Sequence, residues 1–194
     1  MKYVLTLLFI ASIAVSCRNR VSPVSPVPTT QQDTARFYPL ANFIKEQIEY
    51  VDLRGFNIYR VVKKDKKKDS TSCSKDLFLE EAAVFKDRAA SFTRTKAAFR
   101  ESVFDDLSTS SITFSYQCND SKASEVVNID ILLDERTQSV KRVFIRSAYL
   151  RGDTTIQEQC NWKANKSFQV NRTFTTPNGY TSNVNTFVNW DDKP

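Results

Sequence analysis

The pattern of apolar and polar positions divides the chain into a helical first half and a strand-rich second half. In the first half, apolar residues recur at three- and four-residue steps, which predicts two amphipathic helices. From Ser111 onward the period changes to two, which is typical of β-strands with one buried and one solvated face. The helical stripes are Leu40, Phe43, Ile44, Ile48 and Val51, and then Phe78, Ala82, Phe85, Ala89 and Phe92.

Six alternating segments follow Ser111, separated by short sequences rich in Asn, Asp, Gly and Ser. They predict an antiparallel meander of about six strands, with two N-terminal helices packed on one face of the sheet. This is an α+β fold, and its alternative is a β-barrel with the helices at one end. A short strand is also expected over 56–62. Residues 93–106 fit a strand or a continued helix, and the alternation of Phe99, Glu101 and Val103 favours the strand.

The polar sides of two predicted strands carry a dense set of amides. Gln157, Gln159 and Asn161 lie on one strand, and Gln169 and Asn171 on the next. An array of amides can hydrogen-bond sugars or the backbone of a partner, so these five residues are the candidate binding face. A sheet with one solvated face has a similar composition without any ligand.

The first 17 residues have the layout of an export signal. Lys2 precedes an uncharged apolar run that is too short to span a bilayer, and small residues lead into Cys17. This arrangement resembles the lipobox of bacterial lipoproteins, in which the cysteine is acylated and becomes the first residue. Ala14 stands where that pattern most often has Leu. An ordinary secretory signal and a membrane anchor are the two alternatives.

The expected organisation has three parts: a lipoprotein signal peptide over 1–16, a Pro-rich tether over 17–35, and a single globular domain over 36–194. Lipidated Cys17 would hold the protein at a membrane. The tether begins with Arg18-Asn19-Arg20 and lacks the acidic run that resembles a surface-export tag. The expected location is therefore the cell envelope, lipid-anchored at the outer membrane and facing the periplasm.

The amino-acid composition excludes several common classes of catalytic and ligand-binding site. The chain has no histidine and three glycines, which argues against histidine-based catalytic triads, histidine zinc sites and Gly-rich phosphate loops. We therefore expect neither cofactor nor metal. One surviving catalytic route is a carboxylate pair of the glycosidase type. The acids that could supply it are Glu101, Asp105, Asp106, Asp130 and Asp134.

The formal net charge is +6, and much of the excess lies between Lys63 and Lys68. In an exported protein this run predicts a solvated loop, or else contact with anionic headgroups or acidic glycans, and no nucleic acid partner is expected.

Three cysteines are left once Cys17 is lipidated, so at most one internal disulfide forms. Cys118 and Cys160 lie on the apolar sides of predicted strands. Either these two cysteines form a disulfide or both thiols stay unpaired, and the sequence is compatible with each alternative. Cys73 is expected in a Ser/Lys-rich loop.

The whole layout resembles small, uncharacterised lipoproteins of Bacteroidota. The residues that carry the likeness are Cys17, Phe104-Asp105-Asp106, Ile112-Thr113-Phe114-Ser115-Tyr116, Asn161-Trp162, Lys166-Ser167-Phe168 and Val188-Asn189-Trp190. The resemblance brings no activity with it. The leading expectation is a non-enzymatic, lipid-anchored envelope module that binds a glycan or a protein. The alternatives are a carboxylate-dependent glycan hydrolase, and a periplasmic enzyme inhibitor whose 63–75 loop plugs a cleft.

Overall fold

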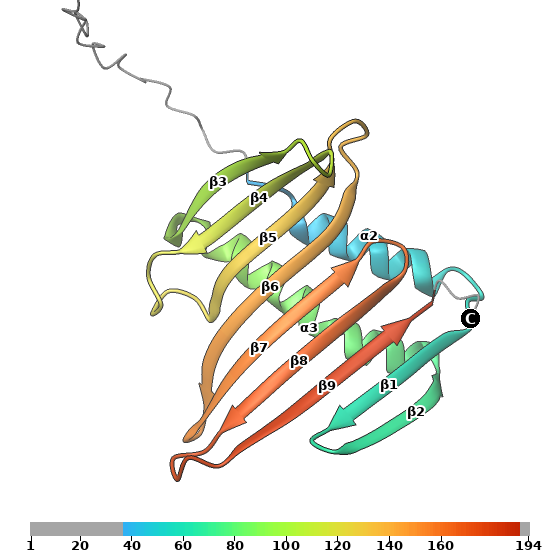
Figure 1. The fold of residues 1–194 in the computed structure, drawn as a ribbon, viewed down its shortest axis with the longest axis vertical. Coiled ribbons are helices and arrows are strands. Elements are labelled where there is room, and N and C mark those ends of the chain that lie inside the picture. The colour runs from blue at the N-terminus through green and yellow to red at the C-terminus, as the bar shows by residue number, and fades with distance from the viewer. Residues whose placement is uncertain (1–36, 191–194) are drawn as a thin grey trace, which may run out of the picture. The chain divides into compact units, whose positions relative to one another are not determined.

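The computed structural model describes residues 37–190, which fold as one open antiparallel β-sheet with two α-helices on one of its faces (Figure 1). The expected signal peptide 1–16, the tether 17–35 and Cys17 lie outside the described residues. The helices are α2 (Leu40–Asp52) and α3 (Lys75–Arg94), and α3 is followed by the short 3-10 helix η1 (Lys96–Ala98). The strands are β1 (Ile58–Lys64), β2 (Lys67–Cys73), β3 (Phe99–Asp106), β4 (Ser111–Cys118), β5 (Val126–Asp134), β6 (Val140–Arg151), β7 (Thr154–Lys163), β8 (Ser167–Thr175) and β9 (Thr181–Asn189).

The strand order across the sheet is β2-β1-β9-β8-β7-β6-β5-β4-β3. Strands β3 to β9 form a continuous meander, and the β1–β2 hairpin joins it because β1 pairs with β9. Helix α3 then connects β2 at one edge of the sheet with β3 at the other (Figure 1). Its 20 residues are about 30 Å long, and nine strands at about 4.8 Å spacing span about 38 Å. One helix therefore crosses most of the sheet.

The expected α+β class is confirmed, and the sheet is open, so the barrel alternative is wrong. The six-strand count is also wrong, because the described residues form nine strands. The placement of the helices differs as well, since the β1–β2 hairpin lies between α2 and α3 in the chain. The strand favoured for 93–106 is confirmed from Phe99 onward, while residues 93 and 94 still belong to α3.

Strand β2 is the element that the sequence pattern did not reveal. It replaces most of the loop expected over 63–75. Every residue of β2 except Cys73 is exposed, so the strand has no apolar alternation to recognise. It lies at the edge of the sheet, where charged side chains protect unpaired backbone groups from pairing with other chains.

The core lies between the sheet and the two helices and is rich in aromatic residues. The expected stripe of α3 is confirmed, since all five of its members are buried. Phe85 contacts Trp162 edge-on with ring centroids 4.9 Å apart, and Phe78 contacts Trp190 at 5.6 Å. Because Phe78 and Phe85 are seven residues apart, two helical turns place both rings on the same sheet-facing side.

A buried glutamine fixes α2 to the turn between β7 and β8. The Oε1 atom of Gln47 accepts hydrogen bonds from Trp162 Nε1 at 3.2 Å and from the backbone N–H of Asn165 at 2.7 Å. Its Nε2 atom donates to Asn165 Oδ1 at 2.9 Å. The amide therefore satisfies an indole N–H in the core, a polar group that is costly to bury without a partner.

Candidate functional site

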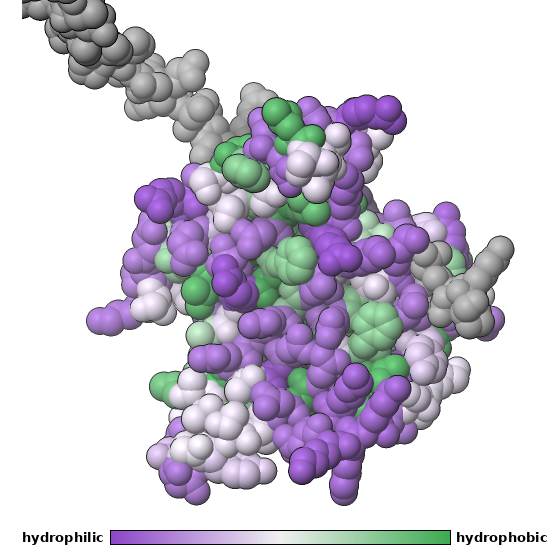
Figure 2. Space-filling model, viewed as in Figure 1, coloured by the Kyte–Doolittle hydropathy of each residue, from purple (hydrophilic) through white to green (hydrophobic). Residues whose placement is uncertain are grey.

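The side of the sheet that faces away from the helices carries a broad polar surface (Figures 1 and 2). On β7, Glu158 bonds to Arg88 of α3, so its neighbours Gln157 and Gln159 point to the opposite side. We call that side the open face. It includes Lys63, Arg142, Phe144, Arg146, Gln157, Gln159, Asn161, Lys163, Gln169, Asn171, Asn183, Asn185 and Phe187.

All five amides of the candidate binding face lie together on the open face. Asn161 stands directly opposite Gln169, and Gln159 directly opposite Asn171, on the paired strands β7 and β8. Gln157 precedes them on β7 and pairs with a threonine. The sequence therefore identified neighbours, although it did not establish what binds to them.

The antiparallel register extends this set into rows that cross several strands. One row runs Arg146, Gln159, Asn171, Asn185 and Lys63, from β6 to β1. It covers four strand spacings, or about 19 Å. Three amides thus lie between two cations along one line.

A parallel row places two aromatic rings beside the amides. Phe144, Asn161, Gln169 and Phe187 occupy successive strands from β6 to β9. Phe144 is 36% exposed and Phe187 is half-buried, so each offers part of a ring to a ligand. Apolar ring surface next to hydrogen-bonding groups is the usual composition of a small-molecule site.

Two adjoining hollows follow these rows and share Gln159 and Asn171. One, of about 490 Å³, is bounded by Asp130, Arg146 and Asn161 among others. The other, of about 290 Å³, lies towards β1. Its further lining residues include Lys63, Asp65, Gln157, Asn183 and Asn185.

Several of these amides keep unused hydrogen-bonding capacity. Asn161 Oδ1 is buried and has no partner within residues 37–190. Asn171 Oδ1, by contrast, accepts from Asn185 Nδ2 and, at 3.4 Å, from Gln169 Nε2. Buried polar atoms are nearly always bonded, so Asn161, which lines one of the hollows, keeps capacity for a further hydrogen bond.

Arg146 is held in place by neutral groups instead of a carboxylate. Its Nε and Nη2 atoms donate to Asn128 Oδ1 at 3.1 and 2.8 Å. The nearby Asp130 accepts from Ser115 Oγ at 2.6 Å. Within residues 37–190 Arg146 makes no ion pair.

A larger hollow than these two, of about 1360 Å³, lies on the other side of the sheet, along α3. Its floor holds Glu158, whose fully buried carboxylate accepts from Arg88 Nε at 2.8 Å and from Arg172 Nε at 2.6 Å. Arg88 also pairs with Glu125 at 2.5 Å and lies over the Tyr149 ring, 4.6 Å from its centroid. Burial alone would lower the pKa of Arg88, but its bonds to Glu158 and Glu125 outweigh that effect and raise it.

The size of this groove does not make it the better site. Its lining contains five acidic and five basic side chains, so it offers no net charge. Both oxygens of Glu158 are occupied by guanidinium groups and are not free to act on a substrate. The cluster is best explained as a structural clamp between α3 and the sheet.

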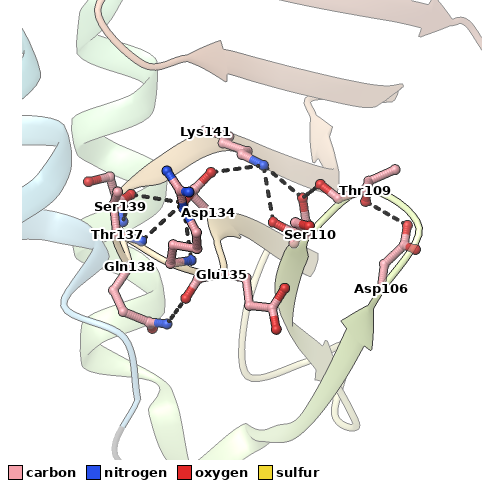
Figure 3. A network of polar contacts seen from close by, with 11 residues as sticks. Asp106, Thr109, Ser110, Asp134, Glu135, Thr137, Gln138, Ser139 and Lys141 are labelled. Atoms are coloured by element: carbon pink, nitrogen blue, oxygen red, sulfur yellow. Dashed lines mark hydrogen bonds and ion pairs between the residues drawn. The ribbon is translucent and has the colours of Figure 1, made fainter.

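The acids considered for a glycosidase pair are not brought together. Asp130 is on the open face, whereas Glu101 and Asp105 lie on β3 at the far edge of the sheet. Asp106 and Asp134 fix turns, as Figure 3 shows. Ser108 and Thr109 lower the pKa of Asp106 by hydrogen bonding. Bonds from Thr137 and Lys141 lower the pKa of Asp134 to about 2.

The network in Figure 3 is therefore a structural one that joins two turns. Lys141 pairs with Asp134 at 3.3 Å and also donates to Ser111 Oγ at 3.0 Å, on the strand that follows the β3–β4 turn. Among the described residues, no three His, Cys, Asp or Glu side chains converge in a way that would hold a metal ion.

The three described cysteines are free thiols. Cys118 and Cys160 lie on β4 and β7, which are separated by β5 and β6. Three strand spacings are about 14 Å, whereas the Cα atoms of a disulfide lie within about 7 Å of each other, so the bridge between them is not formed. Cys73 was expected in a loop but is buried at the end of β2.

Several open-face residues could not be selected from the sequence. Asn183 and Asn185 lie on the last strand, and nothing in the sequence indicated that β9 lies beside β8 and β1. Lys63 was assigned to a solvated loop, and nothing in the sequence singled out Arg146 on β6. Their grouping follows from the strand register, which depends on the whole sheet.

Comparison of the chain with protein-family models, with curated protein sequences and with solved structures found no match. None of the helices within residues 37–190 combines the length and the apolar character that crossing a membrane requires.

Proposed function

We propose that the protein is a non-enzymatic, lipid-anchored module of the cell envelope that binds a glycan on the open face. Acylated Cys17 would attach it to the membrane, and the Pro-rich segment would hold the folded domain away from the lipid. The observation that carries the proposal is the row of amides in the two adjoining hollows, in which Gln157, Gln159 and Asn161 keep unused hydrogen-bonding capacity.

A glycan suits this surface because its hydroxyl groups both donate and accept hydrogen bonds, as an amide side chain does. Asn161 Oδ1 needs a donor, and the side chains of Gln157 and Gln159 make no hydrogen bond within the described residues. The partly exposed rings of Phe144 and Phe187 would meet the apolar faces of sugar rings.

A protein partner is the second occupant to test. Protein interfaces are usually built around a contiguous core that is depleted in charge and rich in aromatic residues. On the open face the exposed apolar side chains are scattered over several strands, with Tyr59 on β1, Phe104 on β3 and Phe144 and Leu150 on β6, and the amides lie between them. The composition therefore favours a hydroxyl-rich ligand.

The test is binding of the full chain, solubilised in detergent, to a panel of purified envelope and extracellular polysaccharides. We expect at least one to bind, and the double variant Gln159→Ala/Asn171→Ala to weaken it about tenfold, as loss of two neutral hydrogen bonds implies. Glu49→Ala on the exposed side of α2 is the control and should bind like wild type. If no polysaccharide binds, or if both variants behave alike, the open face is not a glycan site.

The anchor has a separate test. Metabolic labelling with a radioactive or alkyne fatty acid should label the wild-type protein and leave Cys17→Ser unlabelled. An unlabelled wild-type protein would mean that residues 1–17 act as an ordinary secretory signal, and the membrane attachment would be withdrawn.

A further inference from the structure

The β1–β2 hairpin brings like charges directly opposite one another. Lys63 pairs with Lys68, and Lys64 with Lys67, across a two-residue turn that contains another lysine. Directly opposed side chains on antiparallel strands have Cβ atoms about 5 Å apart, and like charges there are destabilising. Within residues 37–190 none of these lysines forms an ion pair. The turn also holds Asp65, so one acidic residue stands among these five lysines, although none of them forms an ion pair with it within residues 37–190.

A second opposed pair of like charges lies at the other end of the open face. Arg142 on β6 stands directly opposite Lys163 on β7, and neither forms an ion pair within the described residues. Arg146, two positions along the same face of β6, is bonded only to the neutral Asn128. Cations therefore gather on both sides of the amide rows.

The two acids that line the hollows, Asp130 and Asp65, form no ion pair with these cations within residues 37–190. Asp130 is occupied by Ser115 and Asn128, and Asp65 accepts from the backbone N–H of Asn183 at 3.1 Å. The two basic groups, Arg142–Arg146–Lys163 and Lys63–Lys68, are about 19 Å apart across β6 to β1. A ligand that meets both must be extended and must carry more than one negative charge.

We propose that the glycan of the open face is an acidic polysaccharide, with carboxylate-bearing sugars whose charges meet the two basic groups while the hydroxyls meet the amides between them. This inference rests on the proposed function, because it names the chemical class of the ligand for the same face. It explains why opposed lysines and an unpaired arginine border a row of amides.

An anionic membrane surface would also attract lysines, but it would leave the rest of the face unexplained. Headgroup attraction needs exposed cations and gains nothing from amides with unused hydrogen-bonding capacity. Here the hollow nearest the hairpin is lined by Lys63 together with Gln157, Asn183 and Asn185. The cations border a recessed polar site, which fits a chain of sugars better than a lipid surface.

The experiment compares each acidic polysaccharide with its own carboxyl-reduced form, so that charge is the variable. Polygalacturonate, alginate and hyaluronate are titrated against the full chain at low and high salt, beside vesicles containing anionic phospholipid. The charge variant is Lys63→Gln/Lys68→Gln, and its matched control is Lys45→Gln/Lys86→Gln, which removes two exposed lysines from the helices on the other side.

We expect at least one acidic form to bind at least tenfold more tightly than its reduced form, and the difference to shrink at high salt. The Lys63/Lys68 variant should lose about tenfold in affinity for that polysaccharide, while the Lys45/Lys86 control keeps wild-type affinity. This second comparison separates a local contact from the net charge of the protein, because both variants lose two positive charges.

The possible failures are distinguishable. If acidic and reduced forms bind equally, the inference is wrong, but the glycan site stands. If both lysine variants weaken binding equally, attraction is non-specific and the inference is also wrong. If no polysaccharide binds in either form, the proposed function fails together with the inference. Binding to anionic vesicles alone would replace both with a membrane-docking role.

Discussion

Replacing Glu158, although it changes only one side chain, should clearly destabilise this fold. Its side chain is fully buried, and each carboxylate oxygen is bonded to an arginine Nε, from Arg88 at 2.8 Å and from Arg172 at 2.6 Å. Replacing it with glutamine keeps the shape but removes the charge and turns an N–H₂ donor towards a guanidinium. Breaking a buried ion pair by removing one partner costs about 3–5 kcal/mol.

The expected cost lies near the lower end of that range. Arg88 retains its 2.5 Å contact with Glu125, and the side chain of Arg172 is 31% exposed and so partly solvated. We therefore expect Glu158→Gln to lower the free energy of unfolding by about 3 kcal/mol. For a domain of this size that corresponds to a fall in Tm of about 6–12 °C.

Urea denaturation followed by circular dichroism, with calorimetry for Tm, measures the effect. Glu49→Gln is the control, because its pair with Lys45 is exposed and should contribute less than about 0.5 kcal/mol. The variant Arg88→Met/Glu158→Leu/Arg172→Met removes all three charges and should be within about 1 kcal/mol of wild type. If Glu158→Gln costs no more than Glu49→Gln, the clamp does not hold α3 to the sheet.

Three further predictions concern single side chains. Gln47→Met keeps the volume but leaves the indole N–H of Trp162 without a partner, so chemical denaturation should show a loss of about 2–3 kcal/mol, and a loss below about 0.5 kcal/mol would contradict this. The pKa of Asp134 is about 2 when folded and near 3.8 without its partners, so its stabilisation is present above pH 4 and lost as the pH falls towards 2. Asp134→Asn should therefore be less stable than wild type at pH 7 and equal to it near pH 2, whereas a difference independent of pH would refute the assignment. Burial, with Glu158 nearby, raises the pKa of the Cys160 thiol, so alkylation of the native protein mapped by mass spectrometry should modify Cys118 much faster, and equal rates would show that the core opens.

The elements with a strong local period were the ones that sequence reasoning located well. The stripe from Phe78 to Phe92 is buried along α3, and each expected strand of the meander is present. The elements that sequence reasoning located least well have no periodic pattern of apolar residues. Strand β2 is exposed on both sides, and its lysines look like loop residues until pairing with β1 and the sheet edge explain them.

Part of the candidate site was predictable for the same reason. The alternation of Gln157, Gln159 and Asn161 with apolar residues showed that they share one side of a strand. It did not show that one of them, Asn161, carries a buried oxygen without a partner. Nor could it show that Gln47, on a helix with exposed polar neighbours, is turned inward to bond Trp162.

The sequence by itself determined the α+β class, the apolar stripes and which side of β7 and β8 is polar, because helical and strand periods are local properties of the backbone. Only the tertiary structure decided that β1 pairs with β9, more than 120 residues away, and so placed Lys63 beside Asn185. Strand order and register depend on burying apolar side chains from the entire chain at once. The charge at both ends of the amide rows, on which the choice of an acidic glycan rests, is therefore a property of the fold.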